Sequence, residues 1–312
     1  MNDQIDLLCL GGSSVDIILG VPRLPVSDEK LVADYAGHQA GGLVANTACA
    51  AAHLGLKVAW GGRVGGDENG RILLNSFAEF DVDTSLSVID AGGITDFTVI
   101  LLEPSGERTI LVVPTVSPTP PLNETILSTL SQVRSVYTVP HTIGWFNQVA
   151  EATHSRSGLV FVDVETSSPV RGAELRDVLT HSDVVFCNQR GLALATGDND
   201  PGTGAKVLLN LGLKCVCVTM GAGGAWAFTP EQRVFSPAFA VPVVDTTGAG
   251  DCFHAVFIYG FLDGWSLDDS LNFANAAAAL HIQQVGPRQG LPTRTQVEAF
   301  LSSHGRLKSK HG

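Results

Sequence analysis

Short apolar runs rich in valine, leucine and phenylalanine alternate along most of the chain with longer stretches in which apolar positions recur at helical spacing. The short runs predict buried strands at residues 7–10, 58–60, 135–139, 159–164, 184–187 and 215–219. The longer stretches predict helices at residues 43–54, 70–80, 143–154, 173–179, 191–195, 203–211, 249–262 and 268–283, the last two closing the chain. Near-continuous apolar strands between helices are typical of a parallel sheet buried on both faces. The pattern therefore predicts an α/β fold with a mostly parallel central sheet.

Two segments, residues 15–37 and 84–114, interrupt this alternation with strand-like runs and turns that carry no helical period. Apolar runs on both sides of residues 104–107 predict a β-hairpin around that turn. Because the two segments share this character although they lie far apart in the sequence, we expect them to pair as a small second sheet. The sequence thus predicts a single domain over residues 1–312, with a β-sheet lid formed by inserted segments at about 15–40 and 84–114.

The segment VVDTTGAGDCF, residues 243–253, passes from an apolar run into a glycine turn and then directly into a helix-like apolar stretch. Gly248 and Gly250 allow the backbone to approach a ligand, and the free N–H groups of a first helical turn bind anions. Asp251 in that turn can accept a proton from a hydroxyl while the N–H groups hold the charge of a phosphoryl group in transfer. The alternative is an aspartate that only stabilises the helix dipole.

A second glycine pair, Gly41 and Gly42, precedes Asn46 and an alanine-rich helical stretch. Backbone N–H groups at paired glycines and a nearby side-chain amide can reach sugar hydroxyls. The alternative is a helix start that needs close backbone packing. Asp16 lies past the first predicted strand, at the sheet edge where open α/β folds bind ligands, or else it serves only as a turn residue.

Composition and charge exclude several classes of protein. The chain has 312 residues, is 45% hydrophobic and carries a formal net charge of −12, which argues against nucleic acid as a partner. No apolar run approaches the roughly 20 residues of a membrane span, and the N-terminus lacks the positive region of a signal peptide. Six cysteines without CxxC spacing, with Cys215 and Cys217 on one face of an apolar run, favour buried reduced thiols and a cytoplasmic location. The negative charge also bears on phosphate ligands. If the glycine turn serves an enzyme that uses ATP, this acidic protein must bind the polyanion through local N–H groups, a few cationic side chains and Mg²⁺.

Two common nucleotide motifs do not occur in the sequence. No glycine precedes Lys-Ser or Lys-Thr, which excludes a Walker P-loop. The glycines of GAGGAW follow the predicted strand at 215–219, but the third glycine position of a dinucleotide fingerprint falls on Trp226 and strand-like residues follow it. His254 lies three residues after Asp251 on the same helical face, where we expect it to be structural.

The segments GGLVANTACAAAHLGLKVAWGGRVGGDENG and DTTGAGDCFHAVF resemble the two signature regions of the ribokinase-like (PfkB) carbohydrate kinases, in the same order and at a matching separation. The resemblance covers nearly all of the chain, from LLCLGGSSVD to GPRQGLPTR. It implies a ribokinase-like three-layer αβα sandwich with a small β-sheet lid. It also implies transfer of a phosphoryl group from ATP, with Mg²⁺, to a sugar hydroxyl.

The resemblance further implies roles for individual residues. It makes Asp251 the catalytic base and Gly248, Ala249 and Gly250 the anion hole for the γ-phosphate. The positions that match sugar-binding residues are Asp16, Gly41, Gly42 and Asn46. The positions that match the nucleotide side are Asn188, Thr219, Gly221, Gly224 and Asn275. The positions that match a monovalent-cation site, and so imply K⁺, are Asp245 and Thr247.

One position departs from the family pattern. Family members usually carry N-x-x-E after a central strand, a motif linked to the handling of Mg²⁺ and phosphate. This chain has Asn188-Gln189-Arg190-Gly191, so glycine stands at the acidic position. Glu165 and other carboxylates of the chain are candidates to replace the missing one.

The sequence favours a ketose or an acidic sugar as the substrate. Arg108, in the segment ERTI, resembles a substrate-facing arginine of ketohexokinase-type members, and its guanidinium can pair with hydroxyl, carboxylate or sulfonate oxygens, or else it is only a solvated hairpin residue. The strings PAFAVPVVDTTGAGDCFH and GPRQGLPTR are most similar to fructokinase-type and sulfofructose-kinase-type members. An adenosine-like nucleoside kinase ranks lower, because Tyr35 and Phe97 are the only aromatic residues in the two lid segments. A non-catalytic sugar or nucleotide sensor on the same scaffold is a further alternative.

The predicted lid also has a consequence for assembly. Edge strands of a small sheet carry unpaired backbone groups that tend to pair with another chain. We therefore expect a homodimer that forms through the lid.

Overall fold

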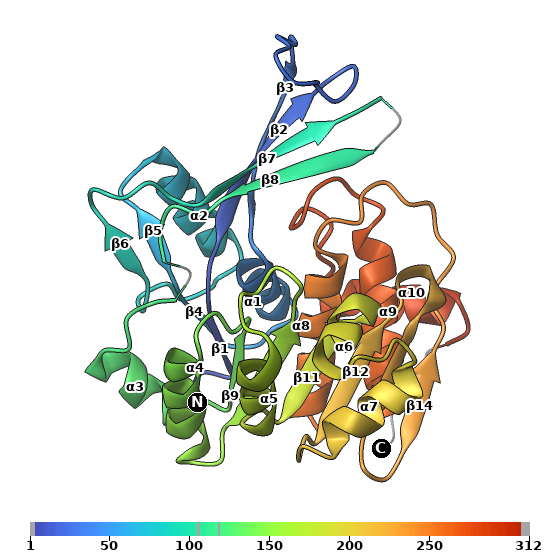
Figure 1. Ribbon diagram of the computed structural model, residues 1–312. Helices are drawn as coiled ribbons and strands as arrows, with labels where there is room; N and C mark the ends of the chain where they lie inside the picture. The colour runs from blue at the N-terminus through green and yellow to red at the C-terminus, as the bar shows by residue number, and fades with distance from the viewer. Residues whose placement is uncertain (1–3, 105–106, 118, 307–312) are drawn as a thin grey trace.

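The computed structural model describes residues 4–104, 107–117 and 119–306 and has an eight-stranded central sheet. Its strand order is β14-β13-β12-β11-β10-β9-β1-β4 (Figure 1). The bounds of these strands are β1 Leu7–Leu10, β4 Val58–Gly61, β9 Ser135–Thr138, β10 Leu159–Val164, β11 Val184–Asn188, β12 Cys215–Thr219, β13 Ala225–Phe228 and β14 Arg233–Ser236. The six strands from β4 to β12 in this order pair in parallel, and β13 and β14 add an antiparallel edge. The predicted mostly parallel sheet is confirmed.

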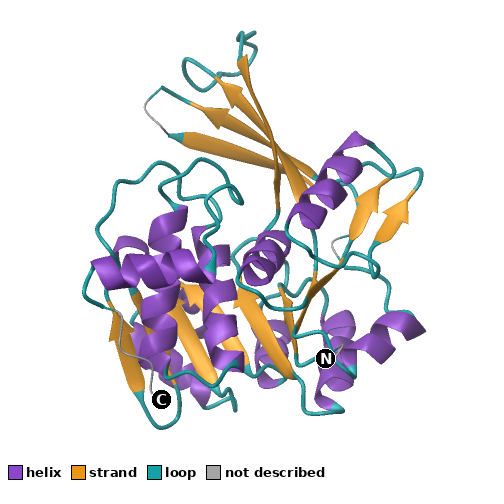
Figure 2. Ribbon diagram, turned by 180° about the vertical axis from the view of Figure 1, so that it is seen from behind, coloured by secondary structure: helices purple, strands orange, loops and turns teal. Residues whose placement is uncertain are grey.

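Helices cover both faces of this sheet and complete a three-layer αβα sandwich (Figures 1 and 2). The helices on one face are α1 Leu43–His53, α8 Ala249–Leu262, α9 Leu267–His281 and α10 Arg294–Ser303. The helices on the other face are α3 Glu124–Leu130, α4 Ile143–His154, α5 Gly172–Thr180, α6 Gln189–Thr196 and α7 Pro201–Leu209. The remaining helix, α2 (Glu68–Glu79), packs against strands at the root of the second sheet.

Alternating residues of each central strand enter two separate hydrophobic cores. On β12, Cys215 and Cys217 pack in the core beneath α8 and α9, whereas Val216 and Val218 pack in the core beneath α4 to α7. This follows from the two-residue period of a strand, which sends neighbouring side chains to opposite faces. All six cysteines are buried and free, as the sequence predicts.

The predicted strands begin and end within one residue of the observed ones, and the predicted helices within two. The largest differences at helix starts have a common cause. The side chains of Asp67, Asn188 and Asp200 accept backbone N–H groups and begin α2, α6 and α7 two residues earlier than predicted. The sequence pattern does not predict α3 or the edge strands β13 and β14, and α10 follows the two helices that it predicts at the end of the chain.

The second sheet is the predicted lid, and it projects above the central sheet in Figure 1. It has the order β3-β2-β7-β8, with β2 Ser14–Gly20, β3 Asp34–Gly41, β7 Phe97–Leu102 and β8 Arg108–Val113. The two segments expected to meet therefore do pair, β2 with β7 in parallel, and β7 and β8 form the predicted antiparallel hairpin. Residues 105 and 106 of its turn lie outside the described residues. One part of the prediction is wrong, because Val88–Asp90 pairs as β6 with β5 (Arg63–Gly65) and not with the lid.

Candidate active site

A pocket of about 680 Å³ lies where β10, β11 and β12 end and where α8 begins. Parallel strands present their carboxyl ends at one edge of a sheet, so residues far apart in the sequence meet there. The predicted site residues that line this pocket are Asn188, Thr219, Gly221, Gly248, Gly250 and Asp251. The other residues that line it are Leu43, Asp163, Glu165, Gln189, Arg190, Met220 and His254.

Helix α8 starts with a glycine turn that borders the pocket. Gly248 has a left-handed backbone (φ 78°) and provides no side-chain cap. A Cβ here would lie 2.8 Å from the carbonyl oxygen of Pro287, so conformation and space both require glycine. A Cβ on Gly250 would meet nothing within 4 Å, because this residue faces open space. The first turn of α8 and the positive end of its dipole thus border an open pocket, as an anion site requires.

Asp251 lies in this first turn and is only 4% exposed. Asn46 donates its Nδ2 hydrogen to Asp251 Oδ2 over 2.8 Å. Burial raises the pKa of Asp251 to about 7; the Asn46 hydrogen bond opposes this rise, and the nearby charge of Glu165 adds to it. A carboxyl group that titrates near neutral pH beside an anion site has the properties of a general base for a hydroxyl.

The paired glycines at the end of β3 allow close packing around Asp16. Gly42 has a φ of 98° and precedes α1, and a Cβ on it would lie 2.7 Å from Ser13 Cα. A Cβ on Gly41 would lie 2.6 Å from Asp16 Oδ2. The packing explanation for this glycine pair is therefore supported, and Asn46, four residues later, holds Asp251.

Asp16 belongs to lid strand β2, next to Thr98 of β7, whose hydroxyl donates to Asp16 Oδ1 over 2.5 Å. Burial raises the pKa of Asp16, although the Thr98 hydrogen bond and the charge of Arg288 oppose this rise. The charge of Asp16 also acts on Asp251. The lid thus brings a second carboxylate close to the predicted base.

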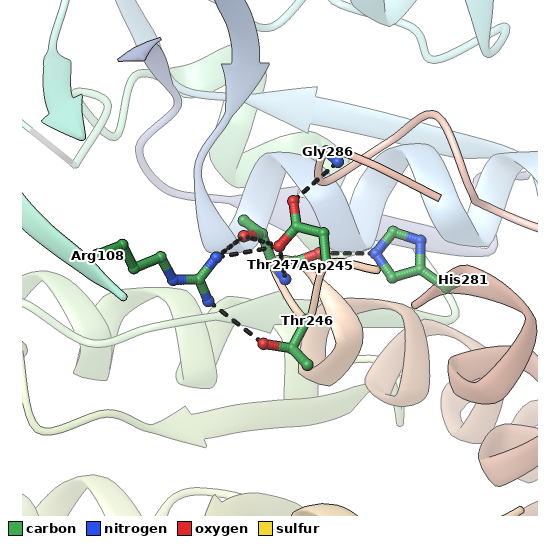
Figure 3. Close-up of polar contacts among 6 residues, drawn as sticks. All are labelled: Arg108, Asp245, Thr246, Thr247, His281 and Gly286. Atoms are coloured by element: carbon green, nitrogen blue, oxygen red, sulfur yellow. Dashed lines mark hydrogen bonds and ion pairs between the residues drawn. The ribbon is translucent and has the colours of Figure 1, made fainter. Parts of the chain in front are cut away.

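Arg108, the first residue of β8, reaches from the lid to the segment that leads into α8 (Figure 3). Its guanidinium donates to Asp245 Oδ1 over 3.0 Å and to the hydroxyl of Thr246 over 3.3 Å. It also donates to the hydroxyl of Thr247. The two residues that match a monovalent-cation site therefore hold a guanidinium in this structure.

Further hydrogen bonds fix this segment against α9 and the loop after it. Asp245 Oδ2 accepts the backbone N–H of Gly286 over 2.9 Å (Figure 3). His281 donates its Nε2 hydrogen to the carbonyl of Thr247 over 2.7 Å. Arg108 thus contacts a braced segment immediately before Gly248.

The predicted nucleotide-side residues divide into two groups. Thr219, Gly221 and Asn188 line the pocket, and Asn188 also caps α6 by accepting two backbone N–H groups over 2.9 Å each. Gly224 and Asn275 do not line this pocket and instead meet at the carbonyl of Ser236. Asn275 Nδ2 donates to this oxygen over 2.9 Å, and a Cβ on Gly224 would collide with it.

Gly191 explains how the chain departs from the family motif. A Cβ at this position would collide with the carbonyl oxygen of Val164, so no acidic side chain fits. The next residue after Val164 is Glu165, whose side chain lines the pocket and whose pKa burial raises. The close contact at Gly191 brings the end of β10, with its carboxylate, against the start of α6.

A buried cluster lies beneath the pocket. His254 Nδ1 lies 3.1 Å from the hydroxyl of Tyr137 and 3.7 Å from Asp163 Oδ2. Burial lowers the pKa of His254 to about 3, so the imidazole is neutral. Its packing against Phe186, with ring centroids 4.4 Å apart, supports the expected structural role.

Some polar side chains in this region are not among the residues that the sequence predicts for the site. Arg288 contacts Asn46 and Thr98 contacts Asp16. The others line the pocket and are Asp163, Gln189 and Arg190. Arg288 stands in the glycine- and proline-rich segment GPRQG, where a lone cation is the one available signal. Thr98 offers no signal, because a threonine in a strand-like run predicts only a strand.

Phosphoryl transfer to a hydroxyl needs an anion site and a base on the same side of a closed cleft. Here one turn of α8 supplies both, and a separate sheet stands over it. The class that this fold and site define is that of the ATP-dependent small-molecule kinases.

The chain belongs to the pfkB family of carbohydrate kinases, whose model matches residues 4–294. An uncharacterized sugar kinase of Archaeoglobus fulgidus is 30% identical over 247 residues, which cover 77% of this chain and 96% of the relative. The ATP-dependent ribose-1-phosphate kinase of Halopiger xanaduensis is 30% identical over 303 residues, which cover 96% of this chain and 99% of the relative. The predicted family and the predicted class, an ATP-dependent carbohydrate kinase, are confirmed.

Solved structures agree with this assignment. Arabidopsis thaliana ribokinase, complexed with ribose and ATP, superposes with a TM-score of 0.85 at 26% identity and covers 96% of this chain and 99% of its own. Thermotoga maritima ribokinase gives a TM-score of 0.83 at 25% identity, with coverage of 96% and 99%. The predicted ribokinase-like fold is confirmed. In the part of the chain that the structure describes, no helix has both the length and the apolar character needed to cross a bilayer.

Proposed function

We propose that this kinase transfers the γ-phosphoryl group of ATP to a hydroxyl of a ketose or an acidic sugar, with Asp251 as the general base. The observation that carries the proposal is the position of Asp251. It is a buried carboxylate in the first turn of α8, and its pKa of about 7 suits proton transfer near neutral pH. The turn Gly248–Ala249–Gly250 forms the anion hole for the phosphoryl group.

The nucleotide occupies the pocket beside this turn. Thr219, Gly221 and Asn188 lie along its nucleotide side, and Arg190 adds a positive charge to a protein that is acidic overall. Gly224 and Asn275 act indirectly, by holding residue 236 against the nucleotide loop. The Arabidopsis ribokinase structure with ribose and ATP supports a sugar and ATP as the two substrates.

Glu165 is the carboxylate that would hold Mg²⁺ near the phosphates. Its oxygen donors fit this hard cation, which retains several waters and phosphate oxygens as ligands. No group of three or more acidic, histidine or cysteine side chains within residues 4–104, 107–117 and 119–306 is placed to hold a metal. Mg²⁺ bound there would neutralise charge on the transferring phosphoryl group.

The transfer itself asks little covalent chemistry of the protein. Asp251 accepts the proton as the O–H bond of the sugar breaks, and the sugar oxygen bonds to the γ-phosphorus as ADP leaves. The N–H groups of the glycine turn hold the equatorial oxygens. Asp16 and Thr98 bind sugar hydroxyls from the lid, and the lid excludes water that would otherwise hydrolyse ATP.

Arg108 supports a ketose or an acidic sugar as the substrate. It is a lid cation whose charge reaches Asp16, and its guanidinium can move from Asp245 to a hydroxyl, carboxylate or sulfonate on the sugar. The names of relatives point to sugar substrates that differ from one relative to another. Two examples are the ribose-1-phosphate kinase named above and the 5-dehydro-2-deoxygluconokinase of Shouchella clausii, which is 24% identical to this chain.

A nucleoside acceptor is the second candidate. Ile110 and Val112 are exposed and share a face of β8 with Arg108, and this apolar surface could pack against a base. A sensor without catalysis is the third candidate, and the buried base argues against it.

The test is ADP release from Mg·ATP with a panel of acceptors: fructose, ribose, fructose 1-phosphate, fructose 6-phosphate, 2-keto-3-deoxygluconate, 6-deoxy-6-sulfofructose and adenosine. We expect one ketose or acidic sugar to stimulate release and Asp251→Asn to reduce turnover by roughly 10²–10⁴-fold while ATP still binds. A response to adenosine alone favours the nucleoside kinase. Silence across the panel with intact ATP binding favours the sensor, and normal turnover in Asp251→Asn refutes its role as the base.

A further inference from the structure

Arg288 lies in the loop between α9 and α10, and its side chain is almost fully removed from solvent, with the residue 4% exposed. A buried guanidinium is tolerated only where its donors are satisfied and its charge is compensated. Its surroundings therefore indicate what this charge does.

Each nitrogen of the Arg288 guanidinium donates to a different part of the fold. Nε donates to Asn46 Oδ1 over 3.0 Å, and one terminal nitrogen donates to the carbonyl of Gly41 over 3.0 Å. The other terminal nitrogen donates to Ser76 Oγ over 2.9 Å, and the guanidinium carbon lies 5.0 Å from the centre of the Phe77 ring. One side chain thus joins the end of β3, the first turn of α1 and helix α2.

The contact with Asn46 determines how its amide is oriented. A guanidinium has donors and no acceptor, so the amide must present its oxygen to Arg288. The amide nitrogen then points to Asp251 and donates to Oδ2 over 2.8 Å. A flipped amide would place donor against donor at Arg288 and acceptor against acceptor at Asp251, leaving buried groups unpaired.

The charge of Arg288 also acts on Asp251 directly. It lowers the pKa of Asp251 against the effect of burial, and it lowers that of Asp16 in the same way. The titratable groups that interact with Asp251 are Asp16, Tyr137, Asp163, Glu165, Cys252 and Arg288. Among these six groups, Arg288 is the only cation.

We propose that Arg288 is a positioning residue for phosphoryl transfer, which acts through the Asn46 amide to orient the carboxylate of Asp251 toward the sugar hydroxyl. The proposal rests on the proposed role of Asp251 as the base. Arg288 touches neither the base nor, in this arrangement, the pocket, and it acts through Asn46 and through its charge.

The experiment compares Arg288→Met and Arg288→Lys with the wild type in steady-state kinetics on the best acceptor of the panel. We expect Arg288→Met to lower kcat by roughly 10- to 100-fold, the range for a misplaced catalytic group, with KM for ATP nearly unchanged. The acid limb of its kcat/KM profile should move up by about one pH unit, because a neighbouring cation favours the ionised carboxylate. Arg288→Lys keeps the charge but loses the planar guanidinium with its several donors. The acid limb should therefore stay near its wild-type position while kcat recovers only in part.

A double-mutant cycle with Asn46→Ala tests the route of the effect. If Arg288 acts through Asn46, the double variant Asn46→Ala/Arg288→Met should lose little more kcat than Asn46→Ala alone. Arg134→Gln is the matched control, because Arg134 also joins distant parts of the fold but does so away from the pocket. Its guanidinium donates to the Asp6 carboxylate over 2.7 Å and to the carbonyl of Leu262 over 2.8 Å. It should reduce stability without moving the acid limb.

Two results would overturn the proposal. One is an Arg288→Met enzyme with wild-type kcat and pH profile, and the other is fully multiplicative losses in the cycle. If Arg288→Met fails to fold, the same cycle is measured with Arg288→Lys. Losses that do not multiply then support a route through Asn46, and fully multiplicative losses overturn it. An active Asp251→Asn variant would refute the proposed function. An inactive Asp251→Asn variant together with an Arg288→Met variant of wild-type activity would refute only the role of Arg288.

Discussion

The guanidinium of Arg108 on the lid lies 3.0 Å from Oδ1 of Asp245, a residue 137 positions further along the chain. The other carboxylate oxygen of Asp245 accepts the N–H of Gly286. A single carboxylate therefore connects the lid, the segment before the glycine turn and the loop that carries Arg288. The position of the lid and the geometry of the anion site are linked by this contact.

Replacing Arg108 tests this connection. We expect Arg108→Met to raise KM for the sugar by roughly tenfold and to increase ATP hydrolysis in the absence of sugar, because the lid loses a charge-assisted contact. Sugar saturation curves and ADP release without acceptor measure the two effects. Arg23→Met is the control, since Arg23 pairs with Glu29 in the loop between β2 and β3 and not with the segment before α8. Unchanged kinetics in Arg108→Met would argue that the contact has no part in closure.

The same contact predicts how the enzyme responds to K⁺. Because the guanidinium engages Asp245 and Thr247, we expect K⁺ to have little effect on the wild type and to reverse part of the rise in KM for the sugar in Arg108→Met, where their oxygens become free. Rates in potassium chloride and in tetramethylammonium chloride, at equal ionic strength, give the measurement. A wild type that depends on K⁺ as strongly as the variant does would contradict this expectation.

Asp251 should control the pH dependence of activity and of stability. Burial raises its pKa to about 7, so kcat/KM should rise with pH and level off above about pH 7, where the carboxylate is ionised. In the unfolded chain the group titrates near 3.9, so the folded state holds this proton more tightly and stability is lost as the pH rises from about 4 to 7. Asp251→Asn carries no such charge, and its free energy of unfolding should exceed that of the wild type by a margin that grows between pH 4 and 8, by up to about 4 kcal/mol.

Urea denaturation of both proteins across this pH range measures the margin. Asp28→Asn, at an exposed turn, serves as the control for the substitution itself. A constant difference between Asp251→Asn and the wild type would show that the carboxyl of Asp251 titrates normally.

Glu165 should determine the response to Mg²⁺. Gly191 leaves no room for the acidic side chain usual in the family, and Glu165 lines the same pocket. We expect Glu165→Gln to raise the Mg²⁺ concentration for half-maximal activity by roughly tenfold, while nucleotide binding without metal is kept. Titrations of activity with Mg²⁺ and of ATP binding in EDTA separate the two. Glu231→Gln, on an exposed turn, is the control, and an identical Mg²⁺ response in both variants would exclude Glu165.

The lid offers a surface for pairing with a second copy. In the described part of the lid, β3 and β8 are edge strands, and Leu111 on β8 is 51% exposed on the face opposite to Arg108. We expect a homodimer at micromolar concentration, and Leu111→Lys should shift it to the 32.7 kDa monomer. Light scattering after size exclusion measures the mass. Val207→Lys, an exposed position on α7, should stay dimeric, and a monomeric wild type would refute the pairing.

Local patterns in the sequence were sufficient for the six parallel strands of the central sheet, most helices and the chemistry of the glycine turn. Apolar runs reveal burial on both faces of a strand, and GAGD reveals a helix start that needs glycine and carries an acid. The observed helix starts differ from the predicted ones where a side chain caps the helix. Helix α3 has only seven residues, which is too short for a helical period to be detected.

The tertiary structure alone decided which side chains meet at the site. Asn46 and Asp251 are 205 residues apart and Asn46 and Arg288 are 242 apart, so no local spacing places them together. Arg108 meets Asp245 only because the lid strands pair in one register and project over α8. Backbone preferences and burial act over a turn or a strand and can be read from a few residues, whereas contacts between distant side chains depend on how the whole chain packs.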